Sequence, residues 1–196
     1  MTSKLFYIIG VSATKIRDTN EPITNLSLPG YDIEFMPSST HFGGFALYVK
    51  NDIDYVKRND LSNSINNVSE SIFVELKRER GKHLIVGCIY RHHSAITDFM
   101  ESFFQDALEK IGKEKKDCAL LGDFNVDLLK FESHNETRDY YDLLSSHGFS
   151  PLILHPTRAT SSSATLIDNI FINNLETCSS GGNITTSISD LFLQFC

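Results

Sequence analysis

Short apolar runs rich in β-branched and aromatic residues recur along the chain, and most are five to eight residues long. They cover residues 5–11, 42–49, 72–76, 84–90, 118–124, 152–154 and 166–172. Runs of this kind, separated by polar segments, are typical of β-strands. The segment Glu79-Arg80-Gly81-Lys82 lies between two of them and predicts a hairpin turn.

Two longer segments have the helical period instead. Residues 97–111 carry apolar side chains at 99, 100, 103, 104, 107, 108 and 111, which form one face of an amphipathic helix. Thr97 is its expected N-cap and Gly112 its expected end. Residues 137–147 predict a second helix that ends at Gly148. Many strands with few helices predict an α+β or layered α/β protein.

The remaining segments set the expected extent of the domain. The segments 59–69 and 177–187 are rich in Asn and Ser and are predicted to be exposed loops. The chain starts almost inside its first apolar run, and residues 192–195 have the pattern of a strand that is just beginning. We therefore expect one domain over residues 1–196 whose N-terminal and C-terminal strands are incomplete.

The composition narrows the class of function. A hydrophobic content of 41% and a charged content of 22% fit a soluble globular protein, and no run is long enough to span a membrane. The net charge of −7 excludes nucleic-acid binding through a global basic field. It leaves open a local site at which a divalent cation supplies the positive charge.

Cysteine usage favours a reducing, intracellular location in the nucleus or cytoplasm. Cys88, Cys118, Cys178 and Cys196 form no CxxC pair, which argues against a zinc site. Cys88 and Cys118 lie in apolar runs and are expected to act as small hydrophobic residues. Secretion is the alternative, because the run 5–11 precedes Val-Ser-Ala13 and four glycosylation sequons occur. That run is at the lower limit of length for a signal peptide.

The segment Gly122-Asp123-Phe124-Asn125 is the first candidate for chemistry. On an extended segment, Asp123 and Asn125 would lie on the same face, and Gly122 would let the backbone approach a ligand. A carboxylate beside an amide suits a site that handles a metal-bound phosphate. An ordinary junction between a strand and a turn is the alternative interpretation.

Four other segments carry polar groups in positions that invite a function. Tyr90 and Arg91 end an apolar run, and both side chains can contact phosphate. Arg158 follows Pro-Thr and precedes a loop of small residues. Asp168 lies inside an apolar run, and an acid in such a place requires a partner. Ser189-Asp190 lies near the C-terminus. Each segment alone is more typical of a structural role.

Taken in order, these segments resemble the endonuclease/exonuclease/phosphatase family, and within it the endonuclease domain of non-LTR retrotransposons. The likeness runs from Ile8-Ile-Gly-Val-Ser12 through Gly43-Gly-Phe-Ala-Leu-Tyr48, residues 122–125 and residues 165–171 to Ser189-Asp190. It implies a four-layer α/β/β/α sandwich of the DNase I-like type. It also implies Mg²⁺-dependent or Mn²⁺-dependent hydrolysis of phosphodiesters in DNA, and a fused or neighbouring reverse transcriptase.

The resemblance implies catalytic roles for four residues. Asp123 would orient or deprotonate the attacking water, and Asn125 would hold the scissile phosphate. Tyr90 would support the phosphate or its transition state. Asp168 would orient a histidine, so that the imidazolium stabilises developing charge.

The resemblance also implies contacts with the metal and the substrate. Asp190 would lie on the metal side of the site. Arg91 and Arg158 are the expected substrate-binding residues.

Two departures from the family pattern affect the expected activity. Ser12-Ala13-Thr14 stands where the family has a metal-binding glutamate, and Ser189-Asp190-Leu191 stands where the family has Ser-Asp-His. Alanine offers no oxygen to a hard cation, and leucine carries no charge. His92 or His93, next to Tyr90, is an alternative source of a histidine.

We therefore expect metal affinity to be reduced and DNA hydrolysis to be weak or lost. The alternative is a non-catalytic relic or nucleic-acid-binding remnant of a retroelement endonuclease. A phosphatase acting on a small molecule or a lipid is less favoured.

Overall fold

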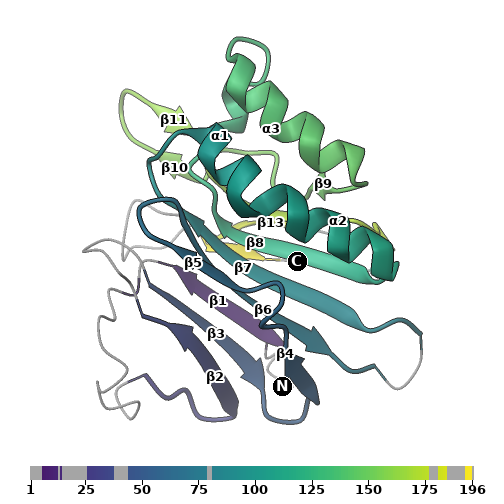
Figure 1. The fold of residues 1–196 in the computed structure, drawn as a ribbon. Coiled ribbons are helices and arrows are strands. Elements are labelled where there is room, and N and C mark those ends of the chain that lie inside the picture. The colour runs from purple at the N-terminus through teal and green to yellow at the C-terminus, as the bar shows by residue number, and fades with distance from the viewer. Residues whose placement is uncertain are drawn as a thin grey trace.

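The structure, a computed structural model, describes residues 6–12, 14, 26–37, 44–78, 81–176, 181–184 and 193–195. Two β-sheets pack face to face, and helices cover the outer face of the larger sheet (Figure 1). These described elements supply three layers of the predicted four-layer sandwich. The mixed sheets and few helices confirm the predicted α+β class.

The larger sheet has the strand order β4-β6-β7-β8-β12-β9, with β5 paired to β6. Its strands are β4 (Tyr55–Lys57), β5 (Asn63–Ile65), β6 (Ser69–Leu76), β7 (Leu84–Arg91), β8 (Asp117–Asp123), β9 (Ser150–Pro151) and β12 (Asp168–Ile172). Only the pair β7–β8 is parallel among them. Because parallel neighbours need a crossover connection, the first helical segment lies between these two strands.

The helical layer buries one apolar face against this sheet. Its elements are α1 (Ile96–Phe99), a π-helical turn (Met100–Phe104), α2 (Gln105–Glu114) and α3 (Asn135–Ser146), preceded by a 3₁₀ turn (Leu128–Lys130). Phe99, Phe104 and Leu108 from the helices meet Phe73 and Ile89 from the strands in one buried cluster. The predicted apolar face of residues 97–111 is therefore the core-facing face.

Both predicted ends of the first helix are wrong. Helix α1 begins one residue before Thr97, and Ala95 occupies the N-cap position without a side-chain hydrogen bond. At the other end, α2 continues through Gly112 to Glu114, and Lys115 adopts the left-handed conformation that ends it. A glycine within an amphipathic segment can remain helical, so Gly112 was a weak stop signal.

The second helix ends where the sequence predicts. Gly148 has a φ of +78°, and its N–H donates to the carbonyl of Ser145 at 2.9 Å. The N–H of Phe149 donates to the carbonyl of Leu144 at 3.0 Å, which completes a Schellman motif. Phe149 and Leu144 are both buried in the main core, so the cap also places the next segment.

The smaller sheet packs against the other face of the larger one. It has the order β1-β3-β2, with β1 (Ile8–Ser12), β2 (Tyr31–Met36) and β3 (Phe45–Lys50), all antiparallel. Phe45, Leu47 and Val49 of β3 share a buried cluster with Val74 and Val86 of the larger sheet. Gly10 lets β1 approach closely, since a Cβ there would lie 2.3 Å from Leu121 Cδ1.

Several segments differ from the sequence prediction. Residues 59–69 are not a plain exposed loop, because they contain β5 and the fully buried Leu61. The run 152–154 is not a strand, since β9 lies just before it. Strands β2 and β4 were not predicted. Two further pairs are β10 (Arg158–Ala159) with β11 (Ala164–Thr165), and β13 (Gly182–Ile184) with β14 (Leu193–Phe195).

Other predictions hold where the structure describes them. The runs around the expected 79–82 turn do form antiparallel neighbours, β6 and β7, although Glu79 and Arg80 lie outside the described residues. Cys88 and Cys118 are buried free thiols, and burial raises the pKa of both. No helix in the described ranges is long and apolar enough to cross a membrane.

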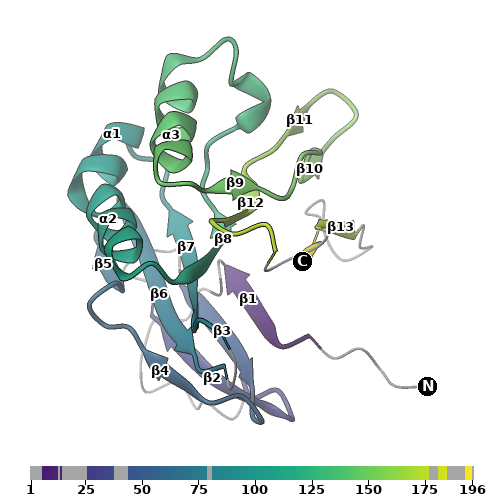
Figure 2. The ribbon, with the colours of Figure 1, turned by 90° about the vertical axis from the view of Figure 1, so that its right-hand side faces the viewer.

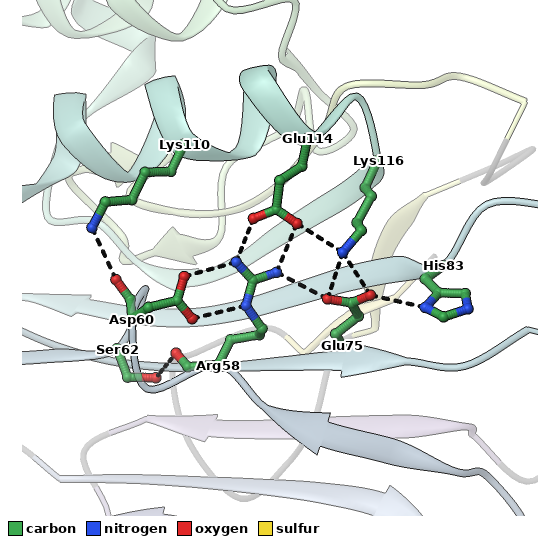
Figure 3. Close-up of polar contacts among 8 residues, drawn as sticks. All are labelled: Arg58, Asp60, Ser62, Glu75, His83, Lys110, Glu114 and Lys116. Carbon is green, nitrogen blue, oxygen red and sulfur yellow. Dashed lines mark hydrogen bonds and ion pairs between the residues drawn. The ribbon is translucent and has the colours of Figure 1, made fainter.

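A charged network fastens the end of α2 to the larger sheet (Figure 3). Arg58, which follows β4, forms ion pairs with Asp60, Glu75 and Glu114 at 2.5–2.9 Å. Glu75 on β6 also forms an ion pair with Lys116, whose Nζ lies 2.8 Å from Oε1 of Glu75. Burial alone would raise the pKa of Glu75, but hydrogen bonds from these cations and His83 lower it to about 2. The network is therefore structural and lies on the helix-facing side of β6.

The backbones of β7 and β8 touch at Gly122. This residue has a φ of +142°, and a Cβ there would lie 1.9 Å from the carbonyl oxygen of Ile89. The sequence suggested that Gly122 makes room for a ligand. The structure shows that it makes room for the neighbouring strand.

We expect Gly122→Ala to lower the free energy of unfolding by about 3 kcal/mol or more, because its side chain meets backbone. Gly112→Ala is the matched control, since no heavy atom lies within 4 Å of a Cβ at that helical position. It should raise stability by about 0.5–1 kcal/mol. Urea unfolding of both variants measures this, and equal stabilities would contradict the described approach of the strands.

Candidate active site

Three of the predicted residues lie in one row across the larger sheet. Tyr90 on β7 is paired with Asp123 on β8, and Asp123 is paired with Asp168 on β12. Residues directly opposite each other on neighbouring strands point to the same face. This is the face that packs against the smaller sheet, and β1 ends against β7 and β8 there (Figure 2).

Asp123 is a buried carboxylate with a partner on each oxygen. Its exposed fraction is 5%. Oδ1 accepts the backbone N–H of Asn125 at 3.0 Å, and Oδ2 accepts Nη2 of Arg158 at 2.7 Å. Burial raises the pKa of Asp123, and the Arg158 guanidinium opposes that rise. Arg158 is therefore the main group that favours the ionised form of Asp123 against the effect of burial.

Asn125 lies in a turn after β8, so its position does not follow from the alternation of side chains along a strand. Strand β8 ends at Asp123, and Asn125 has a φ of +50°. Its side-chain Nδ2 donates to the carbonyl of Arg91 at 2.5 Å. The expectation that an extended backbone places Asp123 and Asn125 on one face is therefore wrong, although the two residues do contact each other.

Arg91 points away from the row. Neighbouring residues of a strand face opposite sides, so Arg91 lies on the helix side when Tyr90 lies on the other. Its guanidinium is buried and donates to the carbonyls of Phe124, Ser94 and Asn125, each at 2.6 Å. This geometry does not support the expected substrate contact. It makes Arg91 the group that holds the turn after β8.

Asp168 has the partner that a buried acid requires. Its Oδ2 accepts the Thr157 hydroxyl at 2.8 Å and lies 3.7 Å from Nε of Arg158. Burial, and then the nearby Asp123 carboxylate, raise the pKa of Asp168 to about 6. Thr157 is fully buried and was missed by the sequence analysis, although it lies within the Pro156-Thr-Arg158 segment.

Arg158 bridges the two acids from the β10–β11 hairpin. It contacts Asp123 through Nη2 and faces Asp168 through Nε. About a third of its side chain, 34%, remains exposed. One guanidinium therefore interacts with two carboxylates, and part of the Arg158 side chain remains exposed to solvent.

The hydroxyl of Tyr90 has no hydrogen-bond partner among the described residues. Burial together with Asp123 and Glu70 raises its pKa. Glu70 on β6 is paired with Tyr90 and extends the row by one strand. The sequence analysis missed Glu70, because the two acids of residues 69–76, Glu70 and Glu75, form no distinctive pattern.

Three of the predicted positions, Ala13, Asp190 and Leu191, lie outside the described residues. The described residues include no group of three or more His, Cys, Asp or Glu that could hold a metal ion. Each oxygen of Asp123 already accepts one hydrogen bond, from Asn125 or from Arg158. The described part of the site therefore does not fit a divalent cation by itself.

Comparisons with known proteins agree on the fold. A model of the endonuclease/exonuclease/phosphatase family matches residues 6–190. The endonuclease domain of TRAS1, a telomere-specific non-LTR retrotransposon, has a TM-score of 0.53 and 14% identity over 74% of this chain and 65% of that one. This chain thus covers less than two thirds of the TRAS1 domain.

Two other solved structures are matched over most of this chain. The Xenopus laevis APE2 catalytic domain has a TM-score of 0.64 and 16% identity over 95% of this chain and 82% of that one. D. rerio TDP2 complexed with single strand DNA product has a TM-score of 0.59 and 10% identity over 95% of this chain and 83% of that one. No curated protein matches the sequence. At these identities the structural matches show a common fold.

The raised pKa of Asp168 predicts a pH-dependent cost in stability. Its folded value of about 6 exceeds the ordinary 3.8, so the folded state holds the proton more tightly than the unfolded chain. Stability should therefore fall by about 1–3 kcal/mol as the pH rises through this window. Asp168→Asn removes the charge and keeps an acceptor for Thr157. We expect this variant to be more stable than the unaltered protein at about pH 8 and similar at about pH 4.

Urea unfolding across this range measures the difference. Asp139→Asn, at an exposed position of α3, controls for the loss of one negative charge. A gain at high pH that is equal in both variants would refute the assignment to Asp168.

Proposed function

This chain belongs to the endonuclease/exonuclease/phosphatase family, whose members hydrolyse phosphodiester bonds in nucleic acids, and on this premise we propose a function for the row. The row of Tyr90, Asp123 and Asp168, with Asn125 and Arg158, binds a DNA phosphodiester. Hydrolysis of that DNA by this chain is weak or lost.

One observation carries the proposal: Arg158 lies between two buried acids and close to Tyr90, whose hydroxyl makes no hydrogen bond to a described residue. Buried carboxylates on an otherwise apolar sheet are costly, and structural reasons alone rarely place two of them in register. The exposed part of Arg158 and the hydroxyl of Tyr90 offer charge-assisted and neutral donors to a phosphate oxygen.

Each residue of the site then has a defined part. Tyr90 and Arg158 contact the phosphate, and Asn125 holds it from the turn after β8. Asp123 orients a water molecule on the opposite side. Arg91 is a positioning residue, since its three bonds to carbonyls fix that turn.

Metal binding is the part of the family's chemistry that this chain supports least. Family members generally depend on a divalent metal. Asp190 is the residue we assign to the metal side, and Ala13 supplies no oxygen where the family has glutamate. Affinity for Mg²⁺ or Mn²⁺ is therefore reduced. With Leu191 in place of histidine, two groups each worth about 10²–10⁴-fold in rate are missing.

DNA is the substrate class that the comparisons support best. TRAS1 contributes an endonuclease domain from a non-LTR retrotransposon, and TDP2 was solved with single strand DNA product. A retroelement origin, with a fused or neighbouring reverse transcriptase and an intracellular site of action, belongs to the same proposal. With a net charge of −7, binding depends on this local site and is weak at high salt.

Replacing the bridging cation tests the proposal. We expect Arg158→Gln to weaken binding of a short fluorescein-labelled DNA duplex about tenfold, because a donor and its charge are lost beside two acids. Arg138→Gln is the matched control, since Arg138 is exposed on α3 away from the row. Fluorescence anisotropy at low salt gives both dissociation constants. Equal weakening of DNA binding in the Arg158 and Arg138 variants would count against the site. So would the absence of DNA binding by the unaltered protein.

A further inference from the structure

We propose that His92, backed by Glu70, is the imidazole of this site and donates a hydrogen bond to the bound phosphodiester. The inference rests on the proposed function and adds a phosphate-contacting residue to it. His92 lies at a different place in the sequence from Leu191, where the family has its histidine.

His92 continues the face of β7 that carries Tyr90. Its backbone N–H donates to the carbonyl of Val68 at 2.9 Å, so the pairing with the β6 side extends through this residue. Residues two apart on a strand share a face. The rings of Tyr90 and His92 accordingly meet edge to face, with centroids 4.9 Å apart.

One nitrogen of the ring faces a carboxylate. Nε2 of His92 lies 3.5 Å from Oε1 of Glu70, but it makes no hydrogen bond of good geometry. The residue is only 8% exposed, and a buried ring nitrogen without a hydrogen bond calls for an explanation. The carboxylate of Glu70 is the acid that faces this nitrogen, and we assign it the role of orienting the ring.

Glu70 is held rigidly enough to orient the ring. It is fully buried, and its Oε2 accepts the backbone N–H of Gly44 at 2.6 Å. The carbonyl of Gly44 in turn accepts the N–H of Thr14 at 3.1 Å. Glu70 therefore connects the main sheet with the start of β3 and, through Gly44, with Thr14.

The other ring nitrogen of His92, Nδ1, has no hydrogen-bond partner among the described residues. In Asp–His pairs, a carboxylate facing one imidazole nitrogen orients the ring so that the other nitrogen can donate to a substrate. Here Glu70 takes the place of the acid, and Nδ1–H is the donor to a non-bridging phosphate oxygen.

The neighbouring His93 provides the contrast. It is exposed and has no ion pair or ring contact among the described residues. The sequence could not distinguish these two histidines, whereas burial and the Glu70 contact separate them. Glu75, on the same strand as Glu70 but in the Arg58 network, provides the corresponding contrast for the acid.

DNA binding by four variants tests the inference. We expect His92→Asn to weaken binding of the labelled duplex about tenfold, the loss of one charge-assisted hydrogen bond, and His93→Asn to leave it unchanged. Glu70→Gln should weaken binding in the unaltered background but add nothing to His92→Asn, because it acts through the imidazole. Glu75→Gln should lower stability without changing the dissociation constant.

A spectroscopic measurement covers the case in which His92→Asn does not fold. In the unaltered protein, the ring resonances of His92 should shift on addition of the duplex, and those of His93 should not. Unshifted His92 resonances in the presence of bound DNA would overturn the inference about His92 and leave the proposed function standing. So would equal affinities of the His92 and His93 variants. Absence of DNA binding by the unaltered protein would overturn the proposed function and this inference together.

Discussion

The parallel pairing of β7 with β8 is the constraint on which the site depends. It sets Tyr90 opposite Asp123, and it requires Gly122 because the carbonyl of Ile89 occupies the space of any side chain. A shift of this register by one residue would turn Tyr90 to the helix face and Arg91 to the site. The bonds from Arg91 to the turn after β8 hold the register from the other side of the sheet.

This register concentrates polar groups at one end of an apolar interface. Glu70, Tyr90, Asp123 and Asp168 occupy four adjacent strands in a single row, whereas their neighbours on the same face are apolar. The elevated pKa of Asp168 shows that the arrangement is not optimised for stability. Groups whose ionisation is opposed by their surroundings are characteristic of functional sites. The Arg58 network differs, because there the surroundings favour ionised Glu75.

The sequence predicted the parts of this structure that depend on local pattern. Most of the long strands and the core face of residues 97–111 follow from periodicity, and the fold followed from the order of the polar segments. The roles of Arg91, Thr157 and Glu70 could not be predicted, because they depend on which face a residue takes and on pairing between distant strands. Helix ends failed at Thr97 and Gly112, where tertiary packing outweighs weak local signals.

We propose that the chain keeps a phosphodiester site and has lost most of its hydrolytic chemistry. Nicking of supercoiled plasmid with Mg²⁺ or Mn²⁺ tests this most directly, with the Ala13→Glu, Leu191→His double variant measured beside the unaltered protein. We expect the unaltered protein to leave the plasmid uncut and the double variant to nick it. Nicking by the unaltered protein that disappears in Asp123→Asn would contradict the account, and an inactive double variant would contradict the roles given to positions 13 and 191.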